Sequence, residues 1–207
     1  MTIISDFSTL TRFYRANLIN SITGYKPAML IGTQDKEGKH NLAIFSSVVH
    51  LGADPALIAF IQRPVGVSGD TFRNIVATGL YTINHVHESF IEKAHYTSAR
   101  FESAISEFEA CKLTPEHVEG FAAPFVKESL VKIGMELVEI IPITHNDTKL
   151  VIGKIKHLCI AEDCIAEDGN VDLHKVNSIC ISGLENYHKA FPLRSFPYAK
   201  VEELPTF

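Results

Sequence analysis

The chain has 207 residues and a formal net charge of −5, from 19 basic and 24 acidic side chains. Hydrophobic residues make up 46% and charged residues 21% of the sequence. This composition is typical of a globular protein and excludes a disordered chain. We therefore expect one domain over residues 1–207, with a sizeable core.

The same numbers exclude several classes of partner. No run of lysine or arginine occurs, so binding to nucleic acid is not expected. The longest apolar runs, such as Ala56–Ile61, are far shorter than the roughly 20 residues of a membrane span. Residues 1–10 contain Asp6 and lack a basic start followed by an apolar stretch, so no secretory signal is predicted. The four cysteines contain no C-x-x-C pair, which favours reduced thiols in a cytoplasmic protein.

The first half of the chain predicts a helix followed by strands. A helix is expected near the N-terminus, capped by Asp6 or Ser8 and stopped by Gly24. Strands are expected over 28–33, 42–51, 56–61 and 80–86, with a tight turn at 35–38 that joins the first two into a hairpin. A short helix over 71–78, capped by Asp70 and ended by Gly79, lies between the last two strands.

The second half predicts further antiparallel strands. Residues 87–110 are expected to be helical or irregular, and residues 113–124 to form a loop. Alternation at Val131, Ile133, Met135 and Leu137 indicates a half-buried strand, and residues 150–160 a returning one. One more short strand is expected near Ile179, followed by a C-terminal helix from about Leu184. Six or seven strands joined as hairpins, with helices inserted, favour a mainly β fold, an antiparallel barrel with helical additions.

Several catalytic and binding motifs are missing. No G-x-G-x-x-G follows a strand and no G-x-x-x-x-G-K-[ST] occurs, so neither a Rossmann site nor a P-loop is predicted. His85 and His87 would share one face of a strand. Zinc needs three or four converging ligands, and no second cluster accompanies this pair, so we predict no metal site.

Polar residues gather at strand ends and at a helix start. Ser46 and Ser47 end one strand, Gln62 and Arg63 end the next, and Thr71, Arg73 and Asn74 open the helix. Guanidinium groups, hydroxyls and free helix N–H groups are what a bound phosphate needs. A solvated barrel end with a helix cap explains the same residues equally well.

The sequence resembles the flavin-reductase-like family of FMN-binding split-barrel proteins, in the branch that includes flavoredoxin. The resemblance covers roughly residues 24–182. A T-x-D-x-x-G-x-x-N segment, an N-x-A-x-F-S strand, a D-P break and a D-T-x-x-N-I segment occur in the family's order. The matching residues are Thr33, Asp35, Gly38, Asn41, Ala43, Phe45, Ser46, Asp54, Pro55, Asp70, Thr71, Asn74 and Ile75.

The resemblance implies a split barrel, FMN as cofactor, NADH or NADPH as electron donor, and a homodimer with FMN at the subunit interface. The strand over 41–47 would run under the flavin ring, while residues 62–63 and 71–74 would lie along the ribityl chain and phosphate. The implied cofactor residues are Asn41, Ala43, Phe45, Ser46, Ser47, Gln62, Arg63, Thr71, Arg73 and Asn74, with Lys26 as a further basic candidate. Tyr187, Arg194 and Tyr198 are tail residues that could close the site.

Three functional interpretations remain open at this point. The first is an NAD(P)H-dependent flavin reductase, in which the cofactor carries the redox chemistry and no dedicated acid or base is required. The second is a non-catalytic FMN electron carrier. The third is a split-barrel module that binds another phosphorylated ligand.

Overall fold

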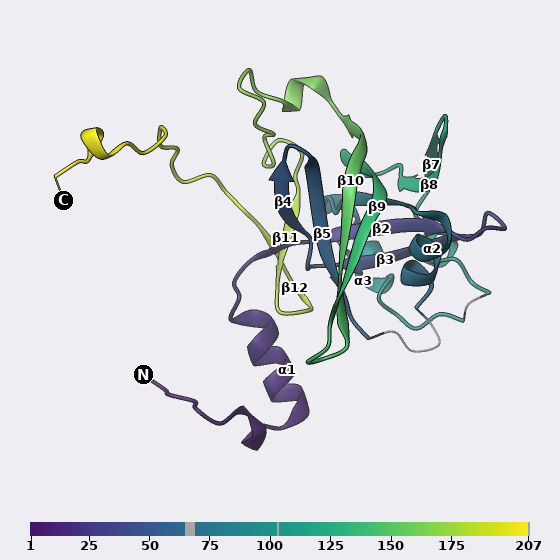
Figure 1. Cartoon of the computed structure of the whole chain (residues 1–207), viewed down its shortest axis with the longest axis horizontal. Coiled ribbons are helices and arrows are strands. Elements are labelled where there is room, and N and C mark those ends of the chain that lie inside the picture. The colour runs from purple at the N-terminus through teal and green to yellow at the C-terminus, as the bar shows by residue number, and fades with distance from the viewer. Residues whose placement is uncertain (65–68, 103, 207) are drawn as a thin grey trace.

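The computed structural model describes residues 1–64, 69–102 and 104–206, and strands dominate it (Figure 1). In these ranges the strands are β1 (Lys26–Pro27), β2 (Met29–Gln34), β3 (His40–Phe45), β4 (Val49–Ala53), β5 (Ala56–Gln62), β6 (Leu80–His85), β7 (Pro115–Val118), β8 (Phe121–Val126), β9 (Val131–Ile143), β10 (Thr148–Ile160), β11 (Ile179–Ser182) and β12 (Asn186–Lys189). The α-helices are α1 (Arg12–Ser21), α2 (Asp70–Thr78), α3 (Ile91–Tyr96) and α4 (Glu107–Ala110). The predicted mainly β fold is confirmed.

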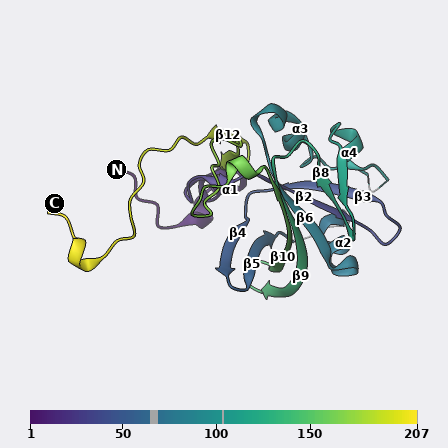
Figure 2. The same ribbon diagram turned by 90° about the horizontal axis from the view of Figure 1, so that it is seen from above.

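The main sheet is antiparallel and has seven strands in the order β3-β2-β6-β9-β10-β5-β4. Its two edge strands, β3 and β4, are consecutive in the chain, and a bend at residues 46–48 joins them. The sheet therefore curls into a barrel that stays open between its edges, which is a split barrel (Figure 2). The prediction of one continuous strand over 42–51 is wrong, because the chain leaves one edge of the sheet at Ser46 and returns at the other edge.

The core lies on both faces of the sheet, and β2 is buried between two apolar clusters. Because side chains alternate along a strand, Leu30 joins one cluster with Leu42 and Phe108. Ile31 faces the other cluster, with Phe60 and Tyr81. This double burial explains why β2 reads as an unbroken apolar run rather than an alternating one.

Smaller elements cover the barrel. Helix α2 packs on β2, β3 and β6, and it ends at Gly79 with a left-handed φ of 74° as predicted. Its N-cap is Gly69, so Asp70 lies in the first turn and the predicted Asp70 cap is wrong. Residues 115–126 form the β7–β8 hairpin, so the predicted loop over 113–124 is also wrong.

The two ends of the described chain extend away from the barrel on one side (Figure 1, Figure 2). Helix α1 contains no buried residue. The predicted C-terminal helix from Leu184 is wrong, because β12 pairs there with β11 in a hairpin anchored on β1. Residues 190–206 then run extended apart from a 3-10 turn at Val201–Glu203. Within the described ranges, no helix is long and apolar enough to cross a membrane.

Candidate functional site

A buried hydrogen-bond network joins the start of α2 to the β2–β3 hairpin. The Asn41 side-chain amide donates to the Thr33 hydroxyl at 3.2 Å and to the Thr71 hydroxyl at 2.9 Å. The Asn74 amide donates to the same Thr33 hydroxyl at 3.2 Å. All four side chains are buried. The structure thus brings together three predicted cofactor residues, Asn41, Thr71 and Asn74, and adds Thr33 as the shared acceptor that fixes α2 on the sheet.

The first turn of α2 carries mixed charge. Arg73 forms an ion pair with Asp70, and both side chains are partly exposed. Nearby, the Glu107 carboxylate accepts a hydrogen bond from the main-chain N–H of Leu42 at 3.0 Å. Burial raises the pKa of Glu107, and the negative charge of Asp70 adds to that rise. A phosphate at this helix start would therefore have to share Arg73 with Asp70.

The opposite end of β3 supplies the other half of the predicted site. Asn41, Ala43 and Phe45 point to one face of β3 because they alternate along the strand. The Phe45 ring meets the buried Phe60 ring edge-on at 5.0 Å between centroids. Ser46 is half-buried in the bend that follows. A strand rises about 3.3 Å per residue, so Ser46 lies roughly 17 Å along the chain from Asn41. The two ends of the predicted site are separate.

The Ser47 hydroxyl fastens the bend to the neighbouring strand. It donates to the carbonyl of Ile61 and accepts from the N–H of Ile61, both at 3.1 Å. Both hydrogen bonds are made with the main chain of β5. They hold the bend between the end of β3 and the start of β4 against that strand. Ser47 therefore fixes the main chain of this segment, and the neighbouring Ser46 N–H and hydroxyl are the groups that the bend presents.

Gln62, the last residue of β5, has a buried oxygen without a partner in the described part of the chain. Its Nε2 donates to the carbonyl of Arg63 at 3.0 Å, while its Oε1 has no hydrogen-bond partner there. An unpaired buried amide oxygen costs about 1–3 kcal/mol. Such an atom fits a ligand that brings an N–H or O–H donor.

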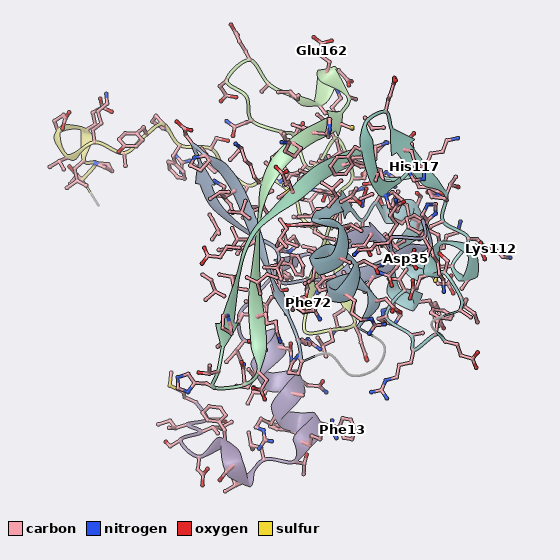
Figure 3. All side chains as sticks on the ribbon, turned by 45° about the vertical axis from the view of Figure 1, so that its right-hand side comes forward. Phe13, Asp35, Phe72, Lys112, His117 and Glu162 are labelled. Atoms are coloured by element: carbon pink, nitrogen blue, oxygen red, sulfur yellow. The ribbon has the colours of Figure 1, made fainter. Side chains whose placement is uncertain are left out.

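Lys149 is a candidate site residue that the sequence analysis did not single out. It lies directly opposite Gln62 in the β10–β5 ladder. Its ammonium stands over the Phe72 ring, 5.4 Å from the ring centroid, and Phe72 projects from α2 (Figure 3). Lys149 therefore spans the gap between the end of β5 and the first turn of α2. A local sequence pattern carries no signal for this position, because it follows from cross-strand register.

Arg63 is placed with α1 rather than with Arg73. Its guanidinium donates to the Asn20 side-chain oxygen at 3.4 Å. Lys26 donates from its ammonium to the main-chain carbonyls of Asn20 at 2.8 Å and Gly183 at 3.1 Å. Partial burial lowers the pKa of Lys26, and the positive charge of Arg63 lowers it further. The positive groups of Lys26 and Arg63 thus both lie at Asn20, near the end of α1. Within the described ranges, neither forms a salt bridge with an acidic side chain.

The two histidines of the His85–His87 pair have separate hydrogen-bond partners. Strand β6 ends at His85, whose Nδ1 is 2.8 Å from the Ser178 hydroxyl. His87 instead accepts a hydrogen bond from the Ser89 N–H at 3.0 Å and caps a 3-10 turn. Over residues 1–64, 69–102 and 104–206, no group of three or more histidine, cysteine, aspartate or glutamate side chains is arranged to hold a metal ion.

The fold is a split barrel, and polar residues lie at the ends of β3 and β5 and at the start of α2. The protein is therefore of the split-barrel class. The family model of the flavin reductase like domain matches residues 25–173, and the chain belongs to this family. The resemblance stated from the sequence is thereby confirmed.

Solved structures of similar proteins agree with the fold. A protein from Shewanella frigidimarina NCIMB 400, assigned as a flavin reductase with a split barrel domain, is 48% identical, with a TM-score of 0.90 over 93% of this chain and 96% of that chain. Nitrilotriacetate monooxygenase component B from Bacillus cereus is 25% identical, with a TM-score of 0.84 over 95% of this chain and 99% of that one. Flavoredoxin of Desulfovibrio vulgaris (Miyazaki F) is 23% identical, with a TM-score of 0.73 over 84% and 92%, and supports the fold alone.

Proposed function

We propose that the protein is an FMN-dependent oxidoreductase that takes electrons from NADH or NADPH and reduces flavin or a related acceptor. In this proposal it works as a single-domain subunit of a cytoplasmic homodimer, with FMN near the subunit interface. The four described cysteines are free, in keeping with a reducing compartment. When bound, FMN supplies the redox chemistry, and the protein contributes binding, orientation and electrostatics.

The Gln62 Oε1 atom, which has no hydrogen-bond partner among the described residues, is the observation that carries this proposal. It accepts a donor from the ligand at the end of β5, where Lys149 and Arg63 supply positive charge. A neutral ligand could donate a hydrogen bond to Gln62 Oε1, but it would not neutralise the positive charges of Lys149 and Arg63. A ligand with hydroxyl or N–H donors and an anionic end uses both, and FMN is such a ligand.

The residues of the chain then divide by role. The β3–β4 bend at Ser46 presents main-chain and hydroxyl groups to the polar edge of the flavin. Gln62 accepts from the polar portion of the cofactor. Arg63, with Lys26 beside it, binds the phosphate. Asn41, Thr71 and Asn74 act indirectly, because their side chains bond one another and hold α2 in place.

The two other interpretations make different predictions. A non-catalytic carrier would hold FMN but would not be reduced rapidly by a nicotinamide. A module for another phosphorylated ligand would purify without a flavin spectrum. A reductase is favoured by the family match and by the flavin reductase assignment of the Shewanella frigidimarina protein.

The cofactor assignment is tested by titrating FMN and riboflavin into apo-protein. Riboflavin lacks the phosphate, so a residue that binds the phosphate affects FMN alone. A hydrogen bond to a charged group contributes about 1.5–3 kcal/mol, and about 1.4 kcal/mol is tenfold in affinity. Arg63→Ala should therefore weaken FMN by about 10- to 150-fold and leave riboflavin nearly unchanged.

Arg73→Ala is the matched control, because Asp70 already balances the charge of Arg73. We expect it to weaken FMN less than Arg63→Ala does. Equal losses of FMN and riboflavin affinity in Arg63→Ala would show that Arg63 does not read the phosphate. No loss for either ligand would place the cofactor elsewhere.

A further inference from the structure

The chain exposes far more surface than a compact protein of its size. Its accessible surface is 13384 Å² for a mass of 22.9 kDa. A compact monomer of this mass exposes about 9,600 Å², so the excess is roughly 3,800 Å². Obligate interfaces bury about 2,000–5,000 Å² in total over both partners. The excess on one chain is therefore large enough to supply its share of such an interface.

The extended C-terminal segment, residues 190–204, which we call the tail, is exposed along its whole length and contributes to this excess. Large apolar side chains recur along it, and each is at least two-thirds exposed: Phe191, Leu193, Phe196, Tyr198, Val201 and Leu204. A solvated linker is normally poor in aromatic residues. The composition of the tail is that of a segment which packs against another surface.

Helix α1 also exposes large apolar side chains to solvent. Phe13 is 78% exposed and stands clear of the barrel (Figure 3), and Ile22, just after the helix, is 64% exposed. An isolated helix of ten residues is marginal in water. The N-terminal helix and the tail therefore both need a surface that this chain alone does not supply.

Strand β4, at one edge of the main sheet, offers an exposed apolar surface on which such a segment could pack. This edge strand is exposed on both faces, and its apolar residues Val49 and Leu51 are 49% and 44% exposed. Native proteins cover or charge such edges, because an open apolar edge invites pairing. In a two-fold dimer every contact occurs twice, so a tail that leaves one subunit can cover β4 of the other while its own β4 is covered in return.

We propose that the tail is an exchange arm that docks on strand β4 of a second copy of this chain. An extended segment of this length reaches about 50 Å, which is enough to cross a subunit boundary. Because β4 follows directly on Ser46 and Ser47, the arm of one subunit borders the candidate site of the other. The proposal rests on the homodimer proposed above, but it does not depend on which flavin or electron donor the protein uses.

Photo-crosslinking at position 198 tests the docking directly. Tyr198 is replaced by p-benzoylphenylalanine in the full-length protein, which is irradiated at low micromolar concentration and run on a denaturing gel. The matched control carries the same group in place of Glu37, an exposed residue of the β2–β3 turn. We expect a covalent dimer from position 198 alone, with the adduct mapped by mass spectrometry to residues 49–53. Adducts within one chain only, no adduct, or an interchain adduct away from β4 would each overturn the proposal.

A pair of double variants measures how much the arm contributes. In Phe196→Ala/Tyr198→Ala we expect the dimer dissociation constant from analytical ultracentrifugation to rise at least tenfold. The control Lys200→Ala/Glu202→Ala changes exposed polar residues of the same segment and should leave it unchanged. Both pairs lie outside the packed barrel, so folding, followed by circular dichroism, should be preserved. Equal dissociation constants for the two variants would contradict an arm that docks through its aromatic residues. Flavin titration of the same samples reports separately on the cofactor proposal.

Discussion

Removing the Asn41 amide should destabilise the protein more than removing the Asn74 amide, because Asn41 makes two hydrogen bonds in the buried network and Asn74 makes one. Asn41→Ala deletes two hydrogen bonds, to Thr33 and Thr71, and leaves both hydroxyls in a buried site. At a net 0.5–1.5 kcal/mol for each bond, the expected loss is about 1–3 kcal/mol. For a chain of this length, 1 kcal/mol shifts the melting temperature by about 2–4 °C, so a fall of roughly 2–12 °C follows.

Two further variants make the measurement specific. Asn74→Ala deletes one amide donor to Thr33 and should lower the melting temperature less. Asn17→Ala, on the exposed side of α1, should stay within about 0.5 kcal/mol of wild type. Thermal unfolding followed by circular dichroism, with denaturant titration as a second method, ranks the three. A fall for Asn41→Ala no larger than that for Asn74→Ala or Asn17→Ala would refute the reasoning that this network anchors α2.

Two predictions concern the core and the pH dependence. Burial lowers the pKa of His85 from 6.5 to about 4. The unfolded chain therefore takes up a proton that the folded chain refuses, and the free energy of unfolding should fall by up to about 3 kcal/mol as pH drops from 6.5 to 4. Urea titrations at pH 7.5 and 4.5 should show a smaller fall in His85→Gln; an equal fall would mean that His85 is not the group responsible. In Gly153→Ala the new methyl group would overlap the Tyr81 ring, only 2.9 Å from Cζ. Such overpacking costs about 1–3 kcal/mol. Adding Tyr81→Phe should recover part of that loss in the same assay, and no recovery would contradict the clash with the Tyr81 hydroxyl.

The strands of the barrel could be predicted where local pattern decides structure. Alternation in β9 and the apolar runs of β2 and β5 identified these strands, and Gly38 and Gly79 marked a turn and a helix end with positive φ as expected. The change of sheet edge between β3 and β4 could not be predicted, because apolar residues lie on both sides of Ser46 and Ser47 and the local pattern does not show which strands pair. Only the pairing of β4 with β5 and of β3 with β2 shows that the chain changes edges there.

The candidate site could be predicted only in part for the same reason. Asn41, Thr71 and Asn74 belong to local motifs, and the structure brings them together. The sequence grouped Arg63 with Arg73, but Arg63 contacts α1, a position fixed by packing between distant segments. Lys149 was missed because it reaches the site through the β10–β5 register.

The most direct test of the proposed function is anaerobic mixing of the FMN-loaded protein with NADH and, separately, with NADPH, followed by flavin absorbance in a stopped-flow instrument. The proposal predicts that at least one nicotinamide bleaches the flavin rapidly and that bleaching saturates as the nicotinamide concentration rises. Flavin that stays oxidised with both donors, while dithionite still reduces it, would contradict a reductase and identify the protein as an electron carrier instead.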